Sequence, residues 1–223
     1  MALLDLDFRL VNVSGEVYAL EDHLELIEQQ LTDIEKQEHI ALRLKREAEG
    51  LSPDDLEWHT LSQEFYDRVH VLLPRVLRGP FVVSLYAVYE SAVTEIASLI
   101  QQKKGMGLAL KDIHGDFLTR ANRYYRHVLG FDLCPDRRVW GRVRMIEDLR
   151  HIIVHANGRM KTVNKEQHKK VSNWISQGIR ISVQHGYLMF EAEFLKEALE
   201  LVGASLHGLV ARYKHWDTHG DSR

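Results

Sequence analysis

One short segment of the 223-residue chain brings together side chains that could act on a phosphate ester. It contains Arg150, His151 and His155. An imidazole can accept or donate a proton near neutral pH, because its reference pKa is about 6.5. A guanidinium is permanently charged, and its planar fork matches two phosphoryl oxygens. These residue types suit acid–base chemistry on a phosphate ester without a metal ion.

The spacing of the three residues predicts how they lie on a helix. His151 and His155 are four residues apart and fall on nearly the same helical face. Arg150 and His155 are five residues apart, which separates them by about 7.5 Å along the axis and about 140° around it. We therefore expect the two histidines to be neighbours, whereas Arg150 and His155 do not share one stripe of the helix.

The context of this segment distinguishes it from a chance match. The same Arg-x4-His spacing recurs at Arg180 and His185, inside a predicted hairpin. The first occurrence instead holds three β-branched apolar residues between its ends and finishes at Asn157-Gly158, a natural stop for a helix. We expect this segment to form the last turns of an amphipathic helix.

In this context the segment resembles the HEPN domain superfamily, whose ribonuclease members carry Arg-x(4–6)-His, often with a polar residue directly after the Arg. Arg150, His151 and His155 fit that pattern. The sequence Tyr86–Glu90 is similar to part of the family's first core helix, and a hairpin followed by a helix ends some members. The resemblance covers about residues 80–213. Some toxin members have a Tyr two positions after the His, where this chain has Asn157.

The resemblance implies a metal-independent endoribonuclease that needs no cofactor and cleaves RNA through attack of the RNA's own 2′-hydroxyl. Arg150 would stabilise the crowded phosphorane. His155 would act as an acid, because the negative end of the helix dipole favours its protonated form. His151 would position the phosphate or carry the second proton.

Apart from the resemblance, Glu90 interrupts the apolar third helix beside Tyr86 and Tyr89, so we expect it to orient Arg150. Asn157 is a second expected supporting residue.

The resemblance also implies partners. In the family the motifs of two protomers commonly meet across a dimer cleft, so we predict a homodimer in which symmetry supplies the missing group. Many members act in toxin–antitoxin pairs or in defence against phage. A growth-limiting toxin held in check by an antitoxin or another protein is therefore the expected biological role.

Three other interpretations remain open. Arg150 could form a helix-surface salt bridge to Glu147 or Asp148. His151 and His155 have the spacing of two zinc ligands, but Ile152 replaces the Glu of a zincin motif and no third ligand is evident. The whole chain could be a noncatalytic HEPN scaffold that binds RNA or a protein partner.

Charge is distributed unevenly, although the formal net charge is only −3. Residues 1–59 contain 5 Lys and Arg against 15 Asp and Glu, whereas residues 120–161 contain 10 against 4. Locally basic surface predicts a focused site for RNA, and an internal pairing of the acidic and basic segments is the alternative. The candidate stacking residues are Tyr124, Tyr125 and Trp140. The candidate phosphate-binding residues are Arg120, Arg123, Arg126, Arg137, Arg138, Arg142, Arg144 and Arg159.

Composition favours a cytoplasmic protein. Cys134 is the single cysteine, so an internal disulfide is excluded. Met1 to Leu10 is not an apolar run, and no later apolar stretch is expected to reach the roughly 18 residues of a membrane span.

Periodicity predicts a mainly α fold, a HEPN-like up-and-down bundle with an N-terminal antiparallel helical pair. The first helix follows a seam from Val17 to Ala41 and stops at Gly50, and the second begins at Ser52-Pro53. Gly79-Pro80 breaks the pattern, so Pro80 should open a third helix.

Further helices are expected near residues 113–129, 135–157 and 165–176. Alternation then predicts a small hairpin over about residues 179–190, followed by a last helix from Ala192 to Tyr213. We predict an acidic helical arm over residues 1–78, a HEPN-like domain over 79–216 and a disordered tail over 217–223.

Overall fold

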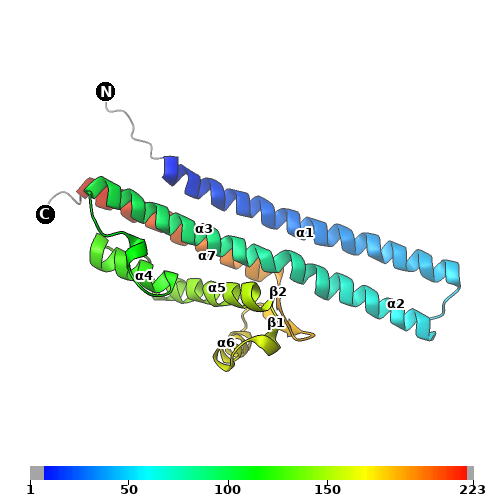
Figure 1. Cartoon of the computed structure of the whole chain (residues 1–223). Coiled ribbons are helices and arrows are strands. Elements are labelled where there is room, and N and C mark those ends of the chain that lie inside the picture. The colour runs from blue at the N-terminus through cyan, green and yellow to red at the C-terminus, as the bar shows by residue number, and fades with distance from the viewer. Residues whose placement is uncertain (1–7, 220–223) are drawn as a thin grey trace. The chain divides into compact units, whose positions relative to one another are not determined.

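The structure is a computed structural model and describes residues 8–219. These residues form seven α-helices, short 3-10 and π-helical turns, and one antiparallel two-stranded hairpin (Figure 1). The mainly α fold and the hairpin immediately before the last helix are therefore confirmed.

The described chain forms two compact units. Unit 1 combines the residues up to Glu21 with Ser84–Leu149 and the residues from Glu197 on, and unit 2 combines Asp22–Val83 with Arg150–Lys196. The predicted domain boundary after residue 78 stays a prediction. The last helix, α7 (Ala192–His219), continues beyond the predicted end at Tyr213, and residues 220–223 of the predicted tail lie outside the described residues.

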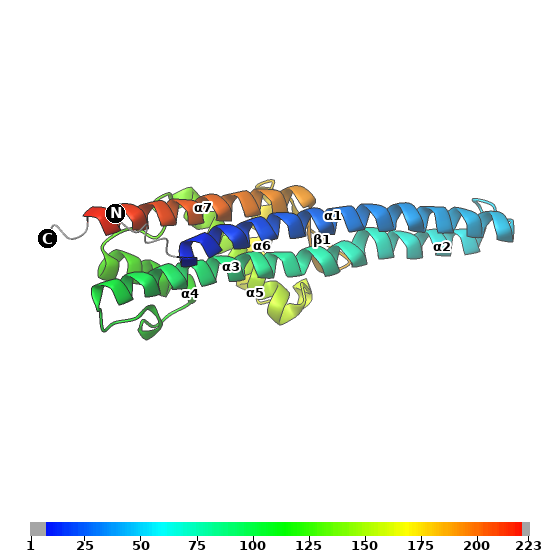
Figure 2. The same cartoon turned by 90° about the horizontal axis from the view of Figure 1, so that it is seen from above.

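An antiparallel helical pair, α1 (Phe8–Glu49) and α2 (Leu56–Tyr66), extends through unit 2, and both views show the two helices side by side (Figures 1 and 2). The residue numbers of contacting side chains fall along α1 as they rise along α2 and the segment that follows it, which is the pattern of antiparallel helices. The pairs are Arg46 with Trp58, His39 with Phe65, Glu38 with Arg68, and Glu28 with Arg78. The predicted pair is thus confirmed, and acidic residues of α1 pair with arginines that follow α2.

The predicted seam of α1 is buried over only part of its length. Its apolar residues from Val17 to Leu31 are buried, whereas Ile34 is half-buried and Ala41 is exposed. The reason is that two helices alone cannot enclose an apolar stripe, and α2 itself has no buried residue.

The predicted start of the second helix is wrong by a few residues. Gly50 ends α1 in the left-handed conformation, as expected, with φ of 64°. The Ser52 hydroxyl, however, accepts from the backbone N–H of Asp54 at 3.3 Å, and α2 begins only at Leu56. Ser52 therefore stabilises a turn and does not cap the helix.

The predicted break at Gly79-Pro80 is also wrong. A π-helical turn (Asp67–Leu72) joins α2 to α3 (Leu73–Lys104), and Pro80 lies inside α3. Gly79 has no Cβ to clash with the proline ring, which removes the usual obstacle to a helical residue before proline. Phe81 and Val82 are fully buried, so packing offsets the hydrogen bond that Pro80 cannot donate.

We expect Pro80→Ala to raise the free energy of unfolding by about 1–3 kcal/mol, because the new N–H restores a helical hydrogen bond. Pro80 is exposed, so little packing is lost. Urea denaturation measures the change. Pro135→Ala is the control, because Pro135 precedes α5 (Arg137–Ala156), and its replacement should change stability by less than about 1 kcal/mol in either direction. Unchanged or lower stability of Pro80→Ala would contradict the prediction.

The continuous helix Leu56–Lys104 contains an 18-residue window that could cross a membrane by length and composition, with a mean hydropathy of 1.5. The expectation that no stretch of this kind exists is wrong by this criterion. A core helix passes the same test, and within unit 1 the α3 residues Leu85, Val93 and Ile96 are buried.

Unit 1 has a core built around the second part of α3. Aspartates begin two of its helices: Asp116 accepts from the backbone N–H of Thr119 before α4 (Phe117–Tyr124), and Asp136 accepts from that of Arg138 before α5. A π-helical turn (Tyr125–Leu129) extends α4 to Gly130, the predicted stop. Sequence reasoning did not expect a buried acid here, yet Glu147 is buried and accepts from the Tyr86 hydroxyl at 2.7 Å.

Candidate functional site at the end of α5

The end of α5 in unit 2 is a sharply defined helix terminus. Asn157 and Gly158 both have positive φ, 48° and 72°, and the Gly158 N–H donates to the carbonyl of Ile152. This bond reaches back six residues, and the two consecutive left-handed residues turn the chain out of the helix. The predicted stop at Asn157-Gly158 is confirmed, and the segment with Arg150 and His155 is helical up to Ala156.

A β-hairpin holds this terminus in place. Strand β1 (Ile181–Gln184) pairs with β2 (Tyr187–Phe190) through a turn at His185 and Gly186, both with positive φ. The Leu188 N–H donates to the Gly158 carbonyl at 2.8 Å, and the Met160 N–H donates to the Gly186 carbonyl at 2.9 Å. Helix α6 (Lys165–Ser176), at its predicted position and capped by Asn164, precedes the hairpin.

The two histidines of the predicted site lie together. Their ring centroids are 6.0 Å apart, and His155 is exposed while His151 is half-buried. The His155 imidazole is therefore accessible and is not enclosed in the apolar core. A catalytic role requires this access. This distance suits two groups that act on one phosphate, one as a base and the other as an acid.

Arg150 occupies a different stripe of the same helix end. It is half-buried, and helical geometry places it near Ile153, which follows it by about one turn. The histidines lie roughly a third of a turn away around the axis. The catalytic roles of these residues stay predictions, as does the role of Glu90, a half-buried residue of unit 1.

Additional cationic groups lie around the hairpin of unit 2. The guanidinium of Arg75, at the start of α3, lies 4.3 Å from the centroid of the Tyr187 ring, and that of Arg159 lies 5.8 Å from it. Sequence reasoning proposed Arg159 as an RNA ligand but missed Arg75 and Tyr187. No local pattern could have found them, because their proximity depends on how α3 and the hairpin fold together.

The predicted arginine cluster of unit 1 is only partly available for RNA. Arg144 donates to the Thr119 hydroxyl at 2.6 Å and lies 3.6 Å from Asp116, so it supports the start of α4. Arg126 lies 3.9 Å from Asp132 in an exposed pair, which contributes little energy. Arg120 and Arg142 are half-buried. The exposed members of the cluster are Arg123, Arg126, Arg137 and Arg138.

Two of the three predicted stacking residues are wrong. Tyr124 and Tyr125 are fully buried, and their hydroxyls donate to the carbonyls of Leu108 and Val93. The amphipathic helix turns these rings into the core, where no base can stack on them. Trp140 is half-buried, with the Arg144 guanidinium 5.6 Å from its ring.

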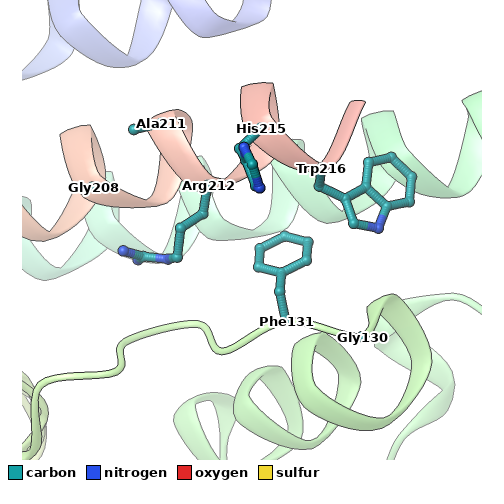
Figure 3. Close-up of a pocket in the computed structure, with 7 residues that line it drawn as sticks. All are labelled: Gly130, Phe131, Gly208, Ala211, Arg212, His215 and Trp216. Atoms are coloured by element: carbon teal, nitrogen blue, oxygen red, sulfur yellow. The ribbon is translucent and has the colours of Figure 1, made fainter. Parts of the chain in front are cut away.

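A pocket of about 620 Å³ lies in unit 1 (Figure 3). Rings of Phe131 and Trp216 line it, and the His215 ring points toward Phe131. Arg212 donates to the Leu133 carbonyl at 2.8 Å, and burial lowers the pKa of its guanidinium. This pocket contains none of the predicted site residues.

Comparisons of the chain with family models, curated proteins and solved structures find no match. Within residues 8–219, no group of three or more His, Cys, Asp or Glu side chains is arranged to hold a metal ion. The structure thus places no third ligand beside His151 and His155 in the part of the chain that it describes.

Proposed function

We propose that this chain is a metal-independent endoribonuclease of the HEPN type. The observation that carries the proposal is the pair of histidine rings 6.0 Å apart at the exposed end of α5. Cationic groups accompany them in the same unit, since Arg150 precedes the pair in α5 and Arg75 and Arg159 lie at the hairpin. Proton transfer and charge stabilisation are the two requirements of phosphodiester cleavage within RNA.

The reaction needs no group beyond the RNA and these side chains. One histidine takes the proton of the 2′-hydroxyl, whose oxygen attacks the adjacent phosphorus. His155 gives a proton to the departing 5′-oxygen, and Arg150 stabilises the negative charge on the phosphorane. The products are a 2′,3′-cyclic phosphate and a 5′-hydroxyl end.

A noncatalytic scaffold is the second candidate, because the outer part of the α1–α2 pair exposes apolar side chains. Ile40, Leu44 and Leu56 are 51%, 55% and 82% exposed. Apolar groups on an otherwise acidic arm are typical of a surface that binds a protein partner. In this function the helical domain would hold RNA or a partner without cleaving either.

Incubating the protein with single-stranded RNA and EDTA distinguishes the two functions. The nuclease should cut the RNA in EDTA and leave a cyclic phosphate end. An oligonucleotide of the same sequence with 2′-deoxyribose throughout should stay intact, because it lacks the attacking hydroxyl. Cleavage of the deoxy control, or loss of cleavage in EDTA, would overturn the mechanism. Binding without cleavage would favour the scaffold.

A further inference from the structure

A second feature of unit 2 is a small pocket beside the end of α5. Its volume is about 170 Å³. The start of α3, the end of α5 and strand β2 enclose it, and most of its wall is apolar. The residues that line it are Arg75, Val76, Gly79, Pro80, Ile153, Asn157, Gly158, Leu188 and Phe190.

The Arg75 guanidinium at this pocket has an unsatisfied donor. Its Nη1 donates to the Asn157 carbonyl at a long 3.5 Å, and its face lies against the Tyr187 ring. Its Nε is buried and has no hydrogen-bond partner among residues 8–219. A buried donor without an acceptor is costly, so a movement of the Arg75 side chain that brings this donor to a bound acceptor would be favoured.

Arg159 adds a second positive charge at the same ring. It is exposed, and its guanidinium lies 5.8 Å from the Tyr187 centroid. In the described part of the chain, neither Arg75 nor Arg159 forms an ion pair with a carboxylate. Two guanidinium groups without counter-ions, next to an apolar pocket, suit a ligand with an anionic and an apolar part.

We propose that this pocket binds one nucleotide, with the base between the apolar walls and the phosphate on Arg75 and Arg159. The volume is below the roughly 300–1,000 Å³ of pockets for drug-sized ligands, which fits a single ring system. Ile153 of the wall follows Arg150 by three residues, about one turn of α5. That this nucleotide is an unpaired nucleotide of substrate RNA rests on the proposed nuclease function. A free nucleotide would present the same base and phosphate to the pocket.

Binding of nucleoside monophosphates to the intact protein tests the pocket without any cleavage. The probes are AMP, GMP, CMP and UMP, the matching nucleosides, inorganic phosphate, and a 2′-deoxy-substituted decanucleotide that cannot be cut. Isothermal titration calorimetry measures their affinities. At least one monophosphate should bind about tenfold more tightly than its nucleoside and than phosphate. The decanucleotide should bind more tightly still if RNA is the natural source.

Three variants locate the binding. Val76 lines the pocket and is 56% exposed, so Val76→Trp covers the entrance without entering the core and should weaken nucleotide binding about tenfold. Leu72→Trp is the matched control, because Leu72 is 46% exposed on the same continuous helix and does not line the pocket. Arg75→Met should remove the advantage of the phosphate, so that the monophosphate binds no more tightly than its nucleoside.

The outcomes separate this inference from the proposed function. Equal nucleotide affinity in Val76→Trp and Leu72→Trp, or no monophosphate binding by the wild type, overturns the pocket even if RNA is cleaved. Nucleotide binding that Val76→Trp and Arg75→Met both weaken supports the pocket even if no RNA is cleaved. Tight binding of monophosphates with no binding of the decanucleotide identifies a free nucleotide as the ligand.

Discussion

His155→Ala should lower the rate of RNA cleavage by about 10²–10⁴-fold, the usual contribution of a positioned general acid or base. His155 is exposed at the end of α5, so its removal creates no cavity and leaves no buried partner unsatisfied. The protein should therefore keep its stability and its affinity for uncleavable RNA. Single-turnover cleavage of end-labelled RNA gives the rate, and thermal unfolding checks the fold.

His168→Ala is the matched control for this experiment. His168 is also an exposed histidine of unit 2, but it lies in α6 and not in the motif. Its replacement should leave the cleavage rate within about twofold of wild type, which corresponds to less than 0.5 kcal/mol. Equal rates for His155→Ala and wild type would exclude the predicted acid and with it the proposed mechanism.

The end of α5 could be predicted from sequence because its determinants are local. Asn157-Gly158 directly after an apolar helical repeat is a local signal for the end of a helix. The positive φ values of both residues confirm that the helix ends there. Likewise, the four-residue spacing of His151 and His155 was enough to predict that their rings lie together. Alternation also predicted the hairpin, in which His185 and Gly186 form the turn.

Features that depend on tertiary packing could not be predicted in the same way. Pro80 is a helix breaker by local rules, but burial of its neighbour Phe81 keeps the helix continuous. Tyr125 stands in a basic segment, yet its ring faces the core of unit 1. The contact between Arg75 and Tyr187 joins residues more than a hundred positions apart, and neither has a sequence signal.

Mixing two inactive variants should restore RNA cleavage if a homodimer forms the site. Because Arg150 and His155 are about 140° apart around α5, the Arg150 of one protomer would work with the His155 of its partner. Arg150→Ala alone should lower the rate by about 10²–10³-fold, through loss of transition-state stabilisation. A mixed dimer of Arg150→Ala and His155→Ala would nevertheless contain one site with both residues intact.

The recovered activity has a definite size. After random exchange of equal amounts, half of the dimers are mixed and each has one of its two sites intact, so about a quarter of wild-type activity should return. Arg150→Ala mixed with the Arg150→Ala/His155→Ala double variant has no intact site and should stay inactive. Sedimentation measures whether dimers form and exchange. If dimers exchange and the first mixture stays as inactive as its parents, the site does not combine residues of two protomers, and each chain must bring its own Arg150 and His155 to the same phosphate.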